Sequence, residues 1–166
     1  MYGPSVPMHL TSFMEGRGRP RHSGPLDGAG RRSLYLNVRR NFLNPLFLAF
    51  DMPVPFSTMG RRNVSNVPAQ ALTLMNDPMV VGQAWLWVKR VMGGPRRSAS
   101  VRLDELFETA FGRPPTDQET RACLAFLDIQ SHSRRDGKSQ DGEAEVLAWT
   151  DLCHVLINAK EFIFVE

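Results

Sequence analysis

The chain has 166 residues, of which 42% are hydrophobic and 22% charged, so its length and composition suit one globular domain. No apolar run reaches the roughly 18 residues that a membrane-spanning helix needs, and residues 1–10 lack the basic start and apolar stretch of a signal peptide. Charge is uneven, because residues 1–100 hold 13 basic and 4 acidic residues while residues 101–166 hold 7 and 13. A basic half of this kind either packs against the acidic half or faces an anionic partner.

Residues 1–30 predict an irregular segment. Gly and Pro recur throughout it, and it has no periodic apolar pattern that could build a core alone. From Ser33 to Val38, the apolar residues Leu34, Leu36 and Val38 alternate with other residues. This period of two predicts one short strand.

The next part of the chain, up to residue 99, predicts three helices that each begin near a proline. Pro45 fits the first turn of a short helix from Leu46 to Phe50, and Pro68 fits that of a helix from Ala69 to Met75. Asp77 has the position of an N-cap before a third helix that begins at Pro78. Its expected inward face carries Val81, Trp85, Val88 and Met92.

Residues 100–166 predict a helical half. Ser100 is the expected cap of a helix that ends at Gly112–Pro115, and Thr116 with Glu119 forms a capping box for an antiparallel helix. Residues 131–142 predict a surface loop before a last helix from about residue 143 to 158. The expected inward residues are Leu103, Leu106, Phe107, Ala110, Cys123, Leu124, Leu127, Val146, Leu147, Leu152, Val155 and Leu156. The predicted fold is therefore mainly α: an irregular Gly-, Pro- and Arg-rich N-terminal segment with one short strand, then about five helices.

Motifs for catalysis and cofactors are not found in the sequence. Cys123 and Cys153 lie in apolar helical patterns, which favours buried free thiols over a disulfide. Neither a haem-attachment spacing nor a four-ligand zinc pattern is present, so we expect no cofactor and no metal in this chain. No Ser stands in a nucleophile motif, and Asp51, Asp77 and Asp151 have no visible catalytic partner. No nucleic-acid module is recognised, so no nucleic-acid partner is expected.

The densest polar group beside apolar residues runs from Arg61 to Gln70. The guanidinium groups of Arg61 and Arg62 and the amides of Asn63, Asn66 and Gln70 suit an anionic or sulfated glycan. The alternative, which we favour, is that these side chains bond loop carbonyls and cap the helix that follows.

Several sequence blocks occur in an order that is typical of a known family. They are Arg31-Arg32-Ser33-Leu34-Tyr35-Leu36, Phe50-Asp51-Met52-Pro53, Gly60-Arg61-Arg62-Asn63-Val64-Ser65-Asn66-Val67-Pro68, Met75-Asn76-Asp77-Pro78, Phe111-Gly112-Arg113-Pro114-Pro115 and Trp149-Thr150-Asp151-Leu152-Cys153-His154. Together they cover nearly the whole chain, which resembles the C-terminal part of the planctomycete-type domain of unknown function 1553 family.

The resemblance implies that residues 1–166 are the C-terminal portion of one domain of a longer protein. Within it, residues 1–30 are loop-like, residues 31–99 form an Arg-rich half and residues 100–166 a helical half. Proteins of this family usually carry a signal sequence, a cytochrome-c-like region and a second domain of unknown function. The family context therefore implies a periplasmic or other extracytoplasmic location, with those domains as partners.

Two functions fit the sequence and the resemblance. The first is a binding or structural module of an extracytoplasmic multidomain protein linked to polysaccharide breakdown. The Arg-rich half favours it, as do the glycan-related genes that are frequent neighbours of the family. The second is part of an enzyme or a cytochrome c-linked redox protein whose active site needs the missing N-terminal domains. The sequence leaves open whether the chain is an enzyme.

Overall fold

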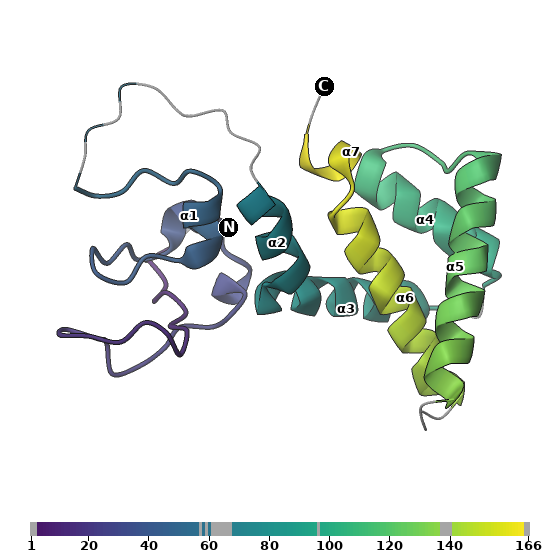
Figure 1. Cartoon of the computed structure of the whole chain (residues 1–166), viewed down its shortest axis with the longest axis horizontal. Helices are drawn as coiled ribbons and strands as arrows, with labels where there is room; N and C mark the ends of the chain where they lie inside the picture. Colours follow the sequence, from purple (N-terminus) through teal and green to yellow (C-terminus); the bar gives the residue numbers. More distant parts are fainter. Residues whose placement is uncertain are drawn as a thin grey trace. The chain divides into compact units, whose positions relative to one another are not determined.

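The computed structural model describes residues 3–56, 58, 60, 68–95, 97–136 and 141–164. The chain divides into two compact units, unit 1 (residues 1–79) and unit 2 (residues 80–166) (Figure 1). The described residues form seven α-helices and no sheet, so the predicted mainly α fold is confirmed. Among them, no helix combines the length and the apolar composition needed to cross a membrane.

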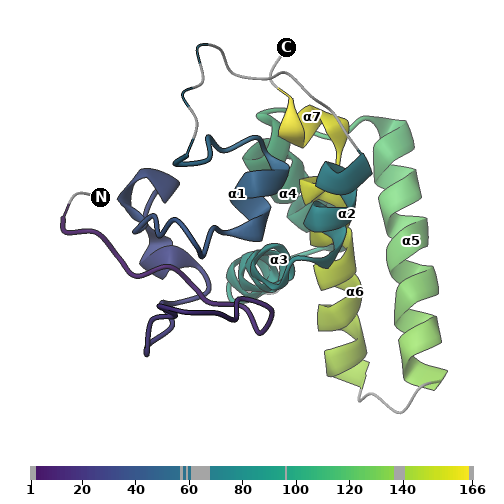
Figure 2. The ribbon, with the colours of Figure 1, turned by 60° about the vertical axis from the view of Figure 1, so that its left-hand side comes forward.

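Unit 1 contains more irregular chain than helix. Its regular elements are two 3-10 turns, Gly28–Gly30 and Ser33–Tyr35, and the helices α1 (Pro45–Ala49) and α2 (Pro68–Asn76) (Figure 2). The irregular segment predicted for residues 1–30 is therefore confirmed apart from the first of these turns.

The predicted strand at Ser33–Val38 is wrong. Residues 33–35 form a 3-10 turn, and only Leu36 pairs, through an isolated bridge to Val6. A strand needs a partner along several residues. The N-terminal segment supplies that partner at one point only, so the alternating pattern does not become a ladder.

Close backbone contact holds unit 1 together at Gly24. Its N–H donates to the carbonyl oxygen of Met8 over 2.9 Å, and a Cβ on Gly24 would lie 1.8 Å from the carbonyl oxygen of Pro7. Only a residue without a side chain permits this approach. Met8 also joins Leu10 and Phe42 in a small buried cluster. Backbone contacts and a small core therefore stabilise unit 1.

The helix starts predicted from prolines are confirmed. Asn44 caps α1, because its Oδ1 accepts a hydrogen bond from the N–H of Leu46 over 2.9 Å. Asp77 caps α3 (Pro78–Met92) in the same way, through a 2.9 Å bond from the N–H of Met79. These caps are local in sequence, which is why the sequence could predict them.

The inward face of α3 was predicted only in part. Val88 is buried in the core of unit 2 and Met92 packs against that core, as expected, together with Ala84. Val81 and Trp85 are instead exposed, Trp85 by 40%. Helical spacing does not distinguish between neighbouring faces of a helix that is apolar on both.

Unit 2 is a bundle of helices around one apolar core. It comprises most of α3 with α4 (Ala99–Phe111), α5 (Asp117–Asp136), α6 (Asp141–Ile157) and α7 (Lys160–Ile163). The antiparallel partner of α5 is α6, which lies beside it in Figure 2, whereas α4 runs obliquely to α5 in Figure 1. The buried core consists of Ala84, Val88, Val91, Leu103, Leu106, Phe107, Leu127, Ala148, Trp149, Leu152, Cys153 and Leu156.

The observed ends of α4 and α5 differ in part from the predicted ends. The predicted break is confirmed at Gly112, whose φ of 68° ends α4 in a left-handed conformation. The cap of α4 is Ser98 rather than Ser100, because Ser98 is extended and its Oγ accepts from the N–H of Val101. The loop predicted from residue 131 is also corrected. Helix α5 continues to Asp136, since residues 131–136 contain no Gly or Pro to end it.

Candidate functional site

Unit 1 contains a cavity of about 780 Å³, called the large cavity below. The chain around residues 33–38, the start of α1 and the segment after α1 supply most of its walls. Its lining consists of Met8, Ser33, Leu34, Leu36, Asn37, Val38, Leu43, Asn44, Phe47, Phe50, Asp51, Met52, Pro53 and Gly60. Apolar walls with a few polar groups are typical of sites for small organic ligands.

The polar groups of the large cavity come from different stretches of chain. Asn37 is half-buried, and its side chain has no hydrogen-bond partner among the described residues. Asn44 uses its Oδ1 as the cap of α1, so its amide nitrogen is the group that remains to donate. Asp51 adds a carboxylate. The lining therefore offers both hydrogen-bond donors and acceptors beside apolar surface.

Asp51 reaches the cavity through an uncommon backbone conformation. Its φ is 56°, in the left-handed region that few residues other than glycine adopt. The turn after α1 imposes it, because the N–H of Asp51 donates to the carbonyl oxygen of Leu48 and the N–H of Met52 to that of Phe47. Asp is among the residues most often found in this conformation, which here ends α1 in the manner common at the C-termini of helices.

A small cavity of about 160 Å³ lies next to the large one in unit 1. The two share the wall residues Ser33, Leu36, Asn44 and Phe47. Three charged residues line the small cavity: Asp27, Arg31 and Asp77. The combined site therefore has one mainly apolar chamber and one charged chamber.

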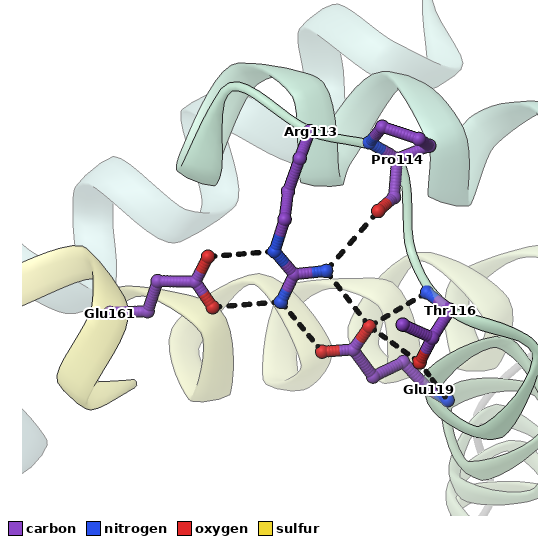
Figure 3. Close-up of polar contacts among 5 residues, drawn as sticks. All are labelled: Arg113, Pro114, Thr116, Glu119 and Glu161. Atoms are coloured by element: carbon purple, nitrogen blue, oxygen red, sulfur yellow. Dashed lines mark hydrogen bonds and ion pairs between the residues drawn. The ribbon is translucent and has the colours of Figure 1, made fainter.

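In unit 2, the most densely bonded polar group surrounds Arg113, in the turn between α4 and α5 (Figure 3). Its guanidinium nitrogens donate to both carboxylate oxygens of Glu161 on α7, at 2.7 and 2.8 Å. They donate likewise to both oxygens of Glu119 on α5, at 2.8 and 3.0 Å, and to the carbonyl oxygen of Pro114. Thr116 completes the predicted capping box with Glu119, which is confirmed.

The Arg113 network is structural, because its donors are all used. An arginine has five N–H donors, and the five hydrogen bonds to Glu119, Glu161 and Pro114 occupy them. The bonds from Arg113 lower the pKa of Glu119 to about 2 and also lower the pKa of Glu161, while the two carboxylates raise the pKa of Arg113. This network ties α7 to the α4–α5 turn and leaves no donor for a ligand.

The polar group predicted as an anion or glycan site lies almost wholly outside the described residues. This applies to Arg61, Arg62, Asn63 and Asn66. Gln70 is described: it lies in the first turn of α2 and is 7% exposed. The ligand assigned to these five residues stays a prediction.

The three aspartates considered as acids or bases have different surroundings. Asp51 lines the large cavity, Asp77 caps α3, and Asp151 forms an ion pair with Arg134. Both cysteines are free thiols, as predicted, and burial raises the pKa of Cys153 to about 12. Within the described ranges, no group of three or more His, Cys, Asp and Glu side chains could hold a metal ion.

Sequence reasoning missed the residues that make this site. Arg31, Asn37 and Asn44 were not singled out, although Arg31 lies in one of the family blocks. No local signal distinguishes it from the other paired arginines of the first half. Only the folded chain shows which guanidinium faces a cavity.

Comparison with known proteins places the chain in a family. No curated protein and no solved structure matches it. A family described as PSD1, Protein of unknown function (DUF1553), matches residues 1–127, which is more than half of the chain and includes all of unit 1. The chain therefore belongs to the DUF1553 family.

Proposed function

We propose that this chain is a glycan-binding module of an extracytoplasmic multidomain protein linked to polysaccharide breakdown. The large cavity of unit 1 carries this proposal. Its volume of about 780 Å³ lies within the range of roughly 300–1,000 Å³ that is typical of small-molecule sites. The family description itself names no function.

The lining of the large cavity suits a sugar chemically. Sugar rings have apolar C–H faces that pack on aromatic side chains, and Phe47 and Phe50 line the cavity. Sugar hydroxyl groups both donate and accept hydrogen bonds, which the amide group of Asn37 can satisfy.

Calorimetric titration of the whole chain with a panel of neutral oligosaccharides tests the proposal. We expect binding that Asn37→Ala weakens by roughly three- to tenfold, the usual effect of one lost hydrogen bond. Asn76→Ala is the matched control, because Asn76 is an exposed amide on α2 that lines neither cavity. Absence of binding for every glycan tried, neutral or acidic, would reject the proposed function.

A further inference from the structure

Arg31 in unit 1 has a buried guanidinium nitrogen without a partner. Its Nη1 is shielded from solvent and makes no hydrogen bond to any described residue. The Cζ atom of the guanidinium lies 5.9 Å from the centroid of the Tyr35 ring. Desolvating a charged donor without giving it an acceptor is costly.

The chain holds the Arg31 guanidinium in place. A Cβ on Gly3 would lie 2.5 Å from Nη2 and 2.8 Å from Nη1, so the backbone of Gly3 lies directly against the group. Tyr35 is the second neighbour. Because these contacts restrict the side chain before a ligand arrives, less conformational entropy is lost on binding.

Arg31 lines the small cavity of about 160 Å³. At roughly 30 Å³ per water molecule, this volume holds a few waters or one substituent of a larger ligand. The wall shared with the large cavity, which includes Asn44 and Phe47, places the small cavity beside the proposed sugar site. A ring in the large cavity could therefore direct one substituent towards Arg31.

The other charged groups of the small cavity limit what the ligand can be. Asp27 and Asp77 line it, and each uses Oδ1 to accept a backbone N–H at a helix start. Neither forms an ion pair with Arg31 in the described part of the chain. His9 also lines it, with Nδ1 3.0 Å from the carbonyl oxygen of Gly24. The two carboxylates repel any anion, a doubly charged one most strongly, and they can also accept hydrogen bonds from sugar hydroxyls.

We propose that Arg31 binds the single negatively charged group of an acidic sugar, a carboxylate or a sulfate ester, in the small cavity beside the large one. This inference rests on the proposed function, since it assigns the class of sugar that the same site accepts. A guanidinium matches either oxyanion through paired N–H donors. The anion site is thus assigned to Arg31, independently of the group from Arg61 to Gln70.

The test compares three disaccharides that differ in one substituent: a neutral one, one with a glucuronate carboxylate and one with a single sulfate ester. Calorimetry of the whole chain should give tighter binding for at least one of the acidic sugars than for the neutral sugar. Arg31→Gln should weaken binding of that acidic sugar by roughly 10- to 100-fold, as expected for a hydrogen bond to a charged group. It should leave binding of the neutral sugar unchanged.

Arg32→Gln is the matched control, because Arg32 is the exposed neighbour and lines neither cavity. Equal binding of all three sugars, with no effect of Arg31→Gln, would overturn the assignment of Arg31 and leave the proposed function intact. If none of the sugars binds, both proposals fall. The preferred acidic sugar identifies the carboxylate or the sulfate as the group recognised.

A second measurement applies if Arg31→Gln does not fold. Nuclear magnetic resonance of the wild-type chain should show the guanidinium N–H signals of Arg31 shifting on addition of the acidic sugar. The signals of Arg113 serve as the internal control, because the donors of Arg113 are already bonded. An unchanged Arg31 signal at saturating sugar would overturn the assignment.

Discussion

Arg31 in unit 1 and Arg113 in unit 2 have the same side chain in opposite surroundings. The donors of Arg113 are fully used by two carboxylates and a carbonyl oxygen, and this network closes the bundle. Arg31 has a buried donor with no partner among the described residues and lines a cavity. The same side chain therefore closes a hydrogen-bond network in unit 2 and lines a cavity in unit 1.

The two units also differ in the size of their buried cores. Among the described residues, twelve buried side chains form the core of unit 2, whereas three form the buried cluster of unit 1. Unit 1 therefore depends more on backbone hydrogen bonds and close backbone packing, such as the contact at Gly24. Binding sites are often found in such regions of lower local stability.

The largest expected effect is in the core of unit 2. Leu103 is 0% exposed, and Leu103→Ala should lower the free energy of unfolding of this unit by about 2–5 kcal/mol, through lost burial and a new cavity. The chain's three tryptophans all lie in residues 80–166, so their fluorescence during urea unfolding reports on this unit. Val101→Ala, at an exposed position of α4, should change the free energy of unfolding by less than about 0.5 kcal/mol. Equal losses in the two variants would contradict the assigned core.

The second prediction concerns the close backbone contact in unit 1. A methyl group at Gly24 would overlap the carbonyl oxygen of Pro7, so Gly24→Ala should destabilise unit 1 by about 1–3 kcal/mol. Faster amide hydrogen exchange within residues 5–50 measures this loss. In Gly82→Ala, the added Cβ on α3 would meet nothing within 4 Å, so a gain of up to about 1 kcal/mol is expected. Tryptophan fluorescence reports on unit 2. If Gly24→Ala lowers the stability seen by fluorescence as much as the stability seen by hydrogen exchange in unit 1, the two units unfold as one.

The third prediction concerns pH and the Arg113 network. Because folding lowers the pKa of Glu119 to about 2, and that of Glu161 below its ordinary value, both carboxylates stabilise unit 2 fully above about pH 5. This stabilisation is lost as the pH falls towards 2. The difference in urea midpoint between wild type and Arg113→Gln should therefore be largest near neutral pH and shrink in acid.

A control separates this network from an ordinary surface ion pair. Arg97 pairs only with Glu105 among the described residues, and both side chains are exposed. Arg97→Gln should shift the midpoint less than Arg113→Gln does at pH 7. A difference between wild type and Arg113→Gln that stays constant from pH 7 to 2 would show that the network does not contribute through charge.

The smallest perturbation is chemical labelling of the thiols. Burial raises the pKa of Cys153 to about 12 and also raises the pKa of the half-buried Cys123. The thiolate is the reactive form. Native protein treated with a maleimide should therefore label slowly at Cys123 and not at Cys153, whereas protein in urea should label at both, as read by intact mass. Rapid labelling of Cys153 in the native state would contradict its burial.

The sequence predicted well what depends on neighbouring residues. The N-cap at Asp77, the capping box of Thr116 with Glu119 and the end of α4 at Gly112 are all confirmed. Each arises from hydrogen bonds or backbone conformation within about four residues. The family blocks, which are also local patterns, led to the family that the comparison shows.

Two of the errors are local, because Ser98 rather than Ser100 caps α4 and α5 extends beyond residue 131. The predicted strand and the predicted face of α3 instead depend on residues far apart in the chain. The alternation around Leu36 formed no strand, because the chain near Val6 pairs with it at one point only. The extension of α5 to Asp136 was missed; along it, Arg134 pairs with Asp151 of α6. Local patterns carry no information about such partners.

The sequence by itself determined where most helices of this protein begin and end, and to which family it belongs. The tertiary structure decided which face of α3 is buried and which arginine lines a cavity. The physical reason is the same in both cases. A cap is completed within one turn of chain, whereas burial and pairing depend on residues that only folding brings together. Arg31 and Arg113 are alike in sequence, but the carboxylates of Glu119 and Glu161 bind Arg113, whereas Arg31 lines a cavity.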